Sequence, residues 1–363
     1  MKIDIHTNLD LFPDSDSARS KPVFASIDEM ADFLINNKIT HNVCLYPRDN
    51  YNMLEQLAAK VPNVTIYGLQ VIAGQKWDTP TDINTLVLDI LDPRKILCKG
   101  IKLASHRGWW YADKSKNAKR KIVDYILQEY EIKPSLTTLR KYDIESGLDY
   151  GDYSTTVNNI LKQLPENAIV SMHTQGDPIM NSGSIPMMVA RYAHKYPKLK
   201  FILNHMGDFG PESQSGKNKK LIYTNKKGEM NLYPPFRYAH SLALISSAIL
   251  YAQQMHNIWL DTSCFLPQKA NLIKQHNCKE WCIGSDYPFI KTINAFVKEE
   301  AKFIKQLINT GCSPEEANRL VNQSHLDTFY WLEATWNVLH EDRVKLLGLD
   351  DFNTDKTEVI VDE

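Results

Sequence analysis

The chain has 363 residues, of which 43% are hydrophobic and 23% are charged, a composition typical of a soluble globular protein. Its formal net charge is −1 and no basic stripe dominates the sequence, so nucleic acid is not an expected partner. No apolar stretch approaches the roughly 18–20 residues that span a bilayer. The N-terminus lacks the positive and apolar regions of a secretory signal. We therefore expect no membrane association and a cytoplasmic location.

The cysteines support the same expectation. They form no CxxC pair and no dense framework, and several stand in apolar runs, where a free thiol behaves as a small hydrophobe. Such usage is typical of a reducing compartment. The six positions are Cys44, Cys98, Cys264, Cys278, Cys282 and Cys312.

Short apolar, β-branched runs alternate with longer segments of helical period along the chain. The predicted strands are 1–6, 42–46, 64–72, 97–103, 168–173, 200–205, 258–261 and 281–285. The predicted helices that follow them are 26–37, 51–60, 81–91, 155–164, 185–196, 241–256, 269–276 and 293–309, with further tail helices at 314–323 and 325–340. Ser26 and Glu29 have the spacing of a capping box, which marks the start of the first helix.

Eight strand–helix units indicate a parallel sheet, and in roughly 300 residues they fit a closed barrel. The rival, a doubly wound open sheet, usually has a glycine-rich loop after its first strand, whereas this chain has Thr7-Asn8-Leu9 there. The predicted fold is an α/β (β/α)8 TIM barrel with helical insertions and a helical C-terminal tail. We expect one domain over 1–345, with insertions at about 105–152 and 207–238, and a tail over 346–363.

Reactive side chains in such barrels gather at the carboxyl ends of the strands. The first predicted strand ends in Asp4-Ile5-His6-Thr7-Asn8, and alternation along a strand places Asp4, His6 and Asn8 on one face. The fifth strand ends in His173, the sixth in His205 and the eighth in Asp286. Three histidines and one aspartate are therefore expected to converge on one rim.

Imidazole and carboxylate groups are the ligands that Zn²⁺ prefers, with one position left open for water. Such an ion lowers the pKa of that water to about 7. A neighbouring carboxylate can then take the proton and return it to a leaving group. A single histidine at such a place is more often structural, so the prediction rests on all of them together. The sequence predicts one divalent metal ion, Zn²⁺ or else Mn²⁺ or a similar ion.

Five ordered motifs between residues 1 and about 290 resemble the strand ends of the amidohydrolase superfamily, in the branch of metal-dependent hydrolases and nonoxidative decarboxylases such as aminocarboxymuconate semialdehyde decarboxylase. The motifs are Ile3-Asp4-Ile5-His6-Thr7-Asn8, Gly100-Ile101-Lys102-Leu103, Val170-Ser171-Met172-His173-Thr174, Leu203-Asn204-His205-Met206-Gly207 and Ile283-Gly284-Ser285-Asp286-Tyr287-Pro288-Phe289.

The resemblance implies a role for each strand-end residue. His6, the position of Asn8, His173 and Asp286 correspond to metal ligands of the family. Asp286 is also implied as the catalytic proton-transfer group. His205 is implied as a catalytic residue that contacts water or substrate beside a single metal ion.

Asn8 departs from the family pattern, because it stands where the second histidine of a His-x-His motif is expected. An amide oxygen is a weaker and harder donor than imidazole. Asn8 either coordinates through oxygen and favours Mn²⁺ or a similar ion, or stands back from a three-ligand site of His6, His173 and Asp286, or marks a degenerate site.

Lys102 is a candidate substrate-binding residue. If its strand neighbours face the outer helices, its side chain points into the barrel, where an unpaired charge is costly. It could neutralise Asp286, bind a substrate carboxylate, or be carboxylated to bridge two metals, although Asn8 argues against a full binuclear site. Lys99, on the opposite face of the strand, is the alternative register.

The insertions on the active rim are expected to supply further substrate contacts, since loops do so in barrels. Arginine suits bidentate carboxylate binding, and aromatic side chains suit flat apolar surfaces. The predicted substrate-binding residues there are His106, Arg107, Trp109 and Arg237.

Three functions remain open from the sequence. The first is a metal-dependent hydrolase of a small carboxylated substrate, an ester, lactone or amide. The second is a nonoxidative decarboxylase with the same metal. The third is a metal-poor barrel that acts as a binding protein. The family resemblance also implies a homodimer.

Overall fold

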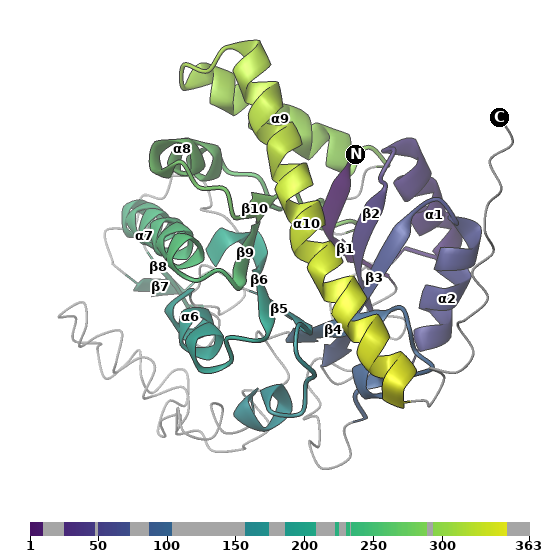
Figure 1. Cartoon of the computed structure of the whole chain (residues 1–363). Helices are drawn as coiled ribbons and strands as arrows, with labels where there is room; N and C mark the ends of the chain where they lie inside the picture. Colours follow the sequence, from purple (N-terminus) through teal and green to yellow (C-terminus); the bar gives the residue numbers. More distant parts are fainter. Residues whose placement is uncertain are drawn as a thin grey trace, which may run out of the picture.

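The computed structural model describes residues 1–9, 25–47, 50–72, 87–103, 157–173, 186–207, 222–224, 230–232, 234–288 and 293–346. Within these residues an eight-stranded parallel sheet curves into a barrel with helices around it (Figure 1). The strands, in their order around the sheet, are β1 (Ile3–Asn8), β2 (His41–Tyr46), β3 (Thr65–Ile72), β4 (Cys98–Leu103), β5 (Ile169–Met172), β6 (Lys200–Leu203), β9 (Ile258–Asp261) and β10 (Trp281–Cys282).

The barrel closes where the chain after β10 meets β1. Ile5 N donates to Ile283 O at 3.2 Å, and Asn8 N donates to Tyr287 O at 2.7 Å. In return, Asp286 N donates to His6 O at 2.9 Å. Eight parallel strands in sequential order, joined at the last edge in this way, confirm the predicted (β/α)8 barrel.

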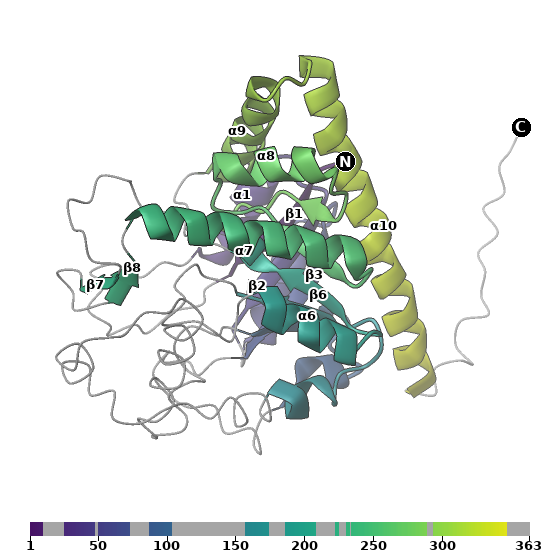
Figure 2. The same cartoon turned by 90° about the vertical axis from the view of Figure 1, so that its left-hand side faces the viewer.

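Helices separate the strands in sequence and cover the outside of the barrel (Figures 1 and 2). They are α1 (Ile27–Asn36), α2 (Tyr51–Lys60), the short 3₁₀ helix η2 (Asp89–Leu91), α6 (Pro186–Lys195), α7 (Pro234–Gln254), α8 (Pro267–His276), α9 (Ala295–Asn309) and α10 (Pro314–Leu346). The predicted capping box is present: Glu29 N donates to Ser26 Oγ, and Ser26 N donates to the Glu29 carboxylate.

Alternation along the strands divides the apolar side chains into two layers. One set, which includes Cys44 and Ile101, packs with the surrounding helices. The other, which includes Leu45, Leu69 and Ile202, forms a separate core inside the barrel. Towards the carboxyl ends of the strands, buried polar side chains such as His6, Lys102 and Asp261 replace the apolar ones.

The tail differs from the prediction of two helices at 314–323 and 325–340. A single helix, α10, runs through Pro314–Leu346. Ser324 causes no break, because its hydroxyl donates to Val321 O at 2.9 Å within the helix. Figure 1 shows α10 crossing the barrel. It contacts the strand beginnings, where Ile3 N donates to His325 Nδ1 at 3.3 Å and Trp259 Nε1 to Thr328 Oγ1 at 2.9 Å.

The insertions differ in how much of them the structure describes. The first, about 105–152, lies outside the described residues, as does most of the helix predicted at 81–91, of which η2 is the described end. The second contains an antiparallel pair that was not predicted, β7 (Ile222–Thr224) and β8 (Met230–Leu232). Helix α7 begins at Pro234 rather than near residue 241, consistent with the preference for proline at a helix start.

All six cysteines are free thiols. Among the described residues, no helix has the length and apolar character needed to cross a membrane.

Candidate metal centre

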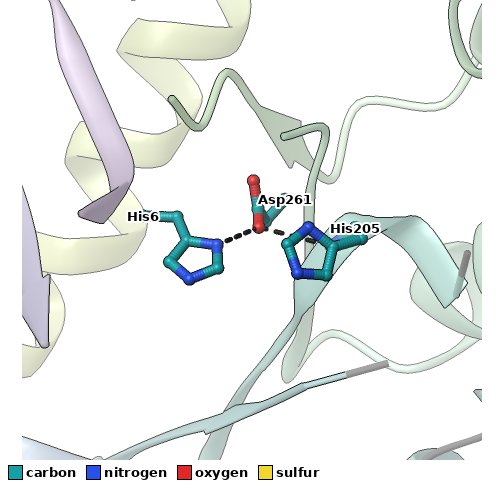
Figure 3. A group of neighbouring side chains, drawn as sticks. All are labelled: His6, His205 and Asp261. Carbon is teal, nitrogen blue, oxygen red and sulfur yellow. Dashed lines mark hydrogen bonds and ion pairs between the residues drawn. The ribbon is translucent and has the colours of Figure 1, made fainter. Parts of the chain in front are cut away.

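Three strand ends bring His6, His205 and Asp261 together at the carboxyl end of the barrel (Figure 3). Asp261 lies between the two imidazoles. Its Oδ2 accepts from His6 Nδ1 at 2.7 Å and from the His205 backbone N at 3.3 Å. The same oxygen also accepts from Ser263 Oγ at 2.6 Å and from Asn204 Nδ2 at 3.1 Å. Asp261 is therefore a fully hydrogen-bonded buried carboxylate.

These contacts keep Asp261 ionised. Burial would raise the pKa of this carboxyl group, but the charge and hydrogen bond of His6 and the hydrogen bond from Ser263 oppose the rise and outweigh it. The pKa of Asp261 is thus held well below its usual range. An anion fixed at this position can orient imidazole rings, because it determines which ring nitrogen carries the proton.

The sequence reasoning did not select Asp261 as a site residue. The signal was present, because Asp261 ends β9, the seventh barrel strand, as predicted. Applied to that strand, the rule that reactive groups stand at strand ends finds Asp261 and the neighbouring Ser263 and Cys264.

His6 is oriented in the way that is usual for a metal ligand. Its Nδ1 is held by Asp261, and its Nε2 lies 3.5 Å from Asp286 Oδ1. Ligating histidines commonly use one ring nitrogen for the metal and the other for a carboxylate that fixes the ring. Nε2 is therefore the atom that His6 offers to a cation.

The strand that carries His6 is irregular, although His6 and Asn8 both reach Asp286 Oδ1. The register of β1 against β2 shifts between Asp4 and Thr7, as at a β-bulge or a similar irregularity. Strict alternation across this shift is lost, so Asp4, His6 and Asn8 cannot be assigned to one face by counting. Asp4 Oδ1 instead accepts from the backbone N of His6 and of Ser285, at 3.1 and 3.0 Å.

Asn8 acts as a hydrogen-bond donor in the described structure. Its Nδ2 donates to Asp286 Oδ1 at 3.0 Å and to Tyr287 O at 3.3 Å. A backbone carbonyl only accepts, so the nitrogen side of the amide faces these groups. Asn8 thus positions Asp286, and coordination through its oxygen stays a prediction.

Asp286 stands in the left-handed region, with φ 52°, at the point where the chain leaves β10. Its Oδ2 accepts from Cys264 Sγ at 3.5 Å. Burial raises the pKa of this carboxyl group; the charge of Asp261 adds to the rise, while His6, Asn8 and Lys102 oppose it. Asp286 is therefore more easily protonated than an ordinary aspartate.

His205 and His173 lie next to each other. His205 Nε2 is 3.3 Å from His173 Nδ1, and the two rings stand edge to face. On its other side, His205 Nδ1 lies 2.8 Å from Ser263 Oγ. Burial, and then the charge of His6, lower the pKa of His205 well below its ordinary value, so this imidazole is neutral at pH 7.

Lys102 projects towards the same centre. Its Nζ donates to Asn204 Oδ1 at 2.6 Å, and the side chain is 4% exposed. Burial lowers the pKa of Lys102 to about 7, against the opposing charges of Asp261 and Asp286. These contacts favour the register with Lys102 facing inward over the Lys99 alternative. Among the described residues Lys102 forms no ion pair, so a direct bridge to Asp286, one of the three alternatives for this lysine, is not present there, and its role in binding a substrate stays a prediction.

The other predicted substrate contacts are not part of this geometry. His106, Arg107 and Trp109 lie outside the described residues. Arg237 belongs to α7, and its side chain is likewise outside the described part of the chain.

The donor chemistry fits one divalent cation. Ligands at about 2.0–2.3 Å from a tetrahedral Zn²⁺ lie roughly 3.3–3.7 Å from one another. The separations of His6 Nε2 from Asp286 and of His205 Nε2 from His173 are within this range. Among the described residues, two groups have all their ligand atoms within 4.8 Å of one another: His6, His205 and Asp261, and His205, Cys264 and Asp286. His173 lies beside these groups rather than in them.

The sequence matches no family model, and no curated protein matches it significantly. Solved structures are similar in overall fold. A probable 2-pyrone-4,6-dicarboxylic acid hydrolase from Acinetobacter baumannii, with citric acid bound, is 14% identical with a TM-score of 0.42, over 89% of this chain and 97% of that chain. An amidohydrolase from Burkholderia multivorans, with HEPES bound, is 9% identical with a TM-score of 0.48, over 90% and 97% of the two chains.

A protein from Agrobacterium tumefaciens, solved without ligand, is 10% identical with a TM-score of 0.44, over 88% of this chain and 92% of that chain. At these identities and TM-scores the likenesses carry no argument about activity, and the architecture rests on the strand order.

Proposed function

We propose that this protein is a metal-dependent hydrolase of a small carboxylated substrate, an ester, lactone or amide. The observation that carries the proposal is the gathering of imidazoles, one of which (His205) has a lowered pKa, and a carboxyl group with a raised pKa at the carboxyl end of a barrel, beside a buried lysine. Groups with such perturbed pKa values, gathered on a barrel rim, are typical of active sites.

His6, His173, His205 and Asp286 are the residues proposed to hold the cation. A bound divalent cation would supply Lewis acidity towards the substrate carbonyl and a lowered pKa for water, to about 7. Zn²⁺ suits this set of nitrogen and oxygen donors. Asp261 and Ser263 hold the rings of His6 and His205, so the imidazoles need little rearrangement to bind it.

Asp286 is the group proposed to move the proton. Water attacks the carbonyl carbon and loses a proton to an Asp286 carboxylate oxygen, and the bond to the leaving oxygen or nitrogen breaks. The same proton then passes from Asp286 to the leaving group. A raised pKa suits this double role, because a group whose pKa lies nearer the working pH both accepts and returns a proton readily.

Lys102 is the reason for proposing a carboxylated substrate. An ammonium has three donors, and Asn204 Oδ1 is the one acceptor found for it among the described residues. Asn204 Oδ1 also accepts from Ser171 Oγ at 2.6 Å, so its position is fixed from two sides. A substrate carboxylate would satisfy the remaining donors of Lys102 and compensate its burial.

The proposal is tested with purified protein on a panel of esters, lactones and amides, each with and without a carboxylate. Acid release should require the metal, return when Zn²⁺ is restored after chelation, and favour the carboxylated member of each pair. Activity that survives full metal removal would contradict the proposal. Release of CO2 instead of acid from carboxylated aromatic compounds would replace it with a nonoxidative decarboxylase.

A further inference from the structure

Cys264 contacts the proposed metal ligand Asp286 but is not itself among the predicted ligands. It follows β9 by three residues, and its thiol lies 3.5 Å from Asp286 Oδ2. Unlike the five other cysteines, which are buried, it is partly exposed. Its backbone carbonyl accepts from Lys269 Nζ at 3.0 Å, and the same ammonium binds Ser263 O at 2.5 Å. The two hydrogen bonds from the fully buried Lys269 therefore hold the backbone that carries the thiol.

His205, Cys264 and Asp286 have ligand atoms within 4.8 Å of one another, which makes them a complete three-donor group. They come from three different strand ends, after β6, β9 and β10. All three have left-handed backbones, with φ of 57°, 56° and 52°. For residues with side chains this conformation is unfavourable. Three such residues deliver a nitrogen, a sulfur and an oxygen to one place.

We propose that Cys264 is a metal ligand of this site and supplies, as a thiolate, the donor that Asn8 does not. The inference rests on the proposed function, because it concerns the same cation. His205, Cys264 and Asp286 form the core of the ligand set, with His6 and His173 on either side. Asn8 is a positioning residue, whose two hydrogen bonds hold Asp286 with Oδ2 towards the thiol.

The donor chemistry gives this site a definite preference. Thiolate is a soft ligand and favours Zn²⁺ over Mn²⁺ or Mg²⁺, whereas an amide oxygen at position 8 would favour the harder ions. Only the deprotonated sulfur coordinates, so metal binding must release the thiol proton. Burial and then the charge of Asp286 raise the pKa of the Cys264 thiol, and the ammonium of Lys269, held at the Cys264 carbonyl, opposes this rise.

The experiment uses the Co²⁺-loaded protein, because thiolate coordination to Co²⁺ gives an intense near-ultraviolet charge-transfer band that nitrogen and oxygen ligands do not. Wild type should show the band. Cys264→Ser should lose it and bind Zn²⁺ at least about 100-fold more weakly, since losing an outer-shell partner alone costs about 10–100-fold. Cys278→Ser is the matched control, because Cys278 is buried beside Glu280 just before β10 begins, whereas the site lies where the strands end. It should keep both the band and the affinity.

A second readout guards against misfolding of the variant. In wild type, Zn²⁺ should slow alkylation of Cys264, measured by mass spectrometry of the labelled peptide, by at least about tenfold. A wild type that binds Co²⁺ without the band, and a thiol labelled equally with and without Zn²⁺, would overturn the role of Cys264 and leave the proposed function standing. Failure of wild type to bind either metal would overturn both.

Discussion

Gly284 carries a sharp prediction, because a side chain there has no free space. A Cβ added at this position would lie 2.0 Å from Asp261 Oδ1, 3.0 Å from Asp261 Cγ and 3.1 Å from His6 Cβ. Ordinary contacts of a Cβ begin at 3.4 Å, so Oδ1 would have to move by about 1.4 Å. Asp261 cannot move that far and keep its bonds to Ser263 N at 2.8 Å and His6 Nδ1 at 2.7 Å.

The cost of Gly284→Ala follows from these contacts. Overpacking of a tight interior costs about 1–3 kcal/mol, and each hydrogen bond to a charged group contributes about 1.5–3 kcal/mol. With one or two bonds of Asp261 lost, we expect the free energy of unfolding to fall by about 3–6 kcal/mol. Urea unfolding of the metal-free protein measures this loss. Zn²⁺ affinity, measured by competition with a chelator, should fall as well, because His6 loses the carboxylate that orients it.

Gly311→Ala is the control, since it changes a glycine without touching the site. Gly311 has φ 93°, and the nearest atom to an added Cβ is Lys274 Nζ at 3.8 Å. The free energy of unfolding of this variant should therefore fall by only about 1–2 kcal/mol, because alanine disfavours the left-handed backbone, and its Zn²⁺ affinity should stay unchanged. If Gly284→Ala unfolds like Gly311→Ala and binds Zn²⁺ like wild type, the position assigned to Asp261 behind His6 is wrong.

Three further predictions test other parts of the site. Ser263→Ala removes the hydroxyl between Asp261 and His205, so Zn²⁺ affinity should fall about 10–100-fold by chelator competition; unchanged affinity would mean that the hydroxyl orients neither group. Calorimetry should show binding of a small dicarboxylate inhibitor weakening as pH rises through about 7, where Lys102 loses its charge, and Lys102→Met should abolish this dependence; a variant with the wild-type profile would refute the role of Lys102. Phe33→Ala removes the ring stacked on Tyr287 at 4.1 Å and should cost about 3–5 kcal/mol in urea unfolding; a loss below about 1 kcal/mol would contradict this packing.

Much of the fold follows from the sequence because its signals are local. The alternation of apolar strands with helical segments is a short-range pattern, and it predicted all eight strands of the barrel. Pairing order could be inferred as well, since sequential units in a parallel barrel are neighbours in space. The single tail helix α10 escaped prediction because a polar residue such as Ser324 can bond within its own helix instead of ending it.

The site could be predicted less completely, because its contacts join residues that are distant in sequence. His6, His205 and Asp286 were found from their places at strand ends. Asp261 stands at such an end too, but its role is visible only when it lies 2.7 Å from His6, 255 residues away. The register shift in β1 depends on the neighbouring strand, so no count along the sequence reveals it.

The role of Asn8, which departs from the family motif, can be inferred only from its contacts in the structure. In the sequence it is a missing histidine with three possible consequences. In the structure its amide nitrogen holds Asp286 and the carbonyl of Tyr287, while Cys264 reaches the same carboxylate from the other side. Cys264 lies 256 residues after Asn8, and a lone cysteine after a strand gives no signal in the sequence that it would approach Asp286.

The most direct test of the central claim is the metal content of the purified protein, measured by inductively coupled plasma mass spectrometry on wild type and on His6→Ala. If the rim of the barrel is a metal centre, wild type should hold close to one Zn²⁺ per chain after dialysis, and His6→Ala should hold little. Less than about 0.2 metal ions per wild-type chain after incubation with Zn²⁺, or full occupancy in His6→Ala, would contradict the claim.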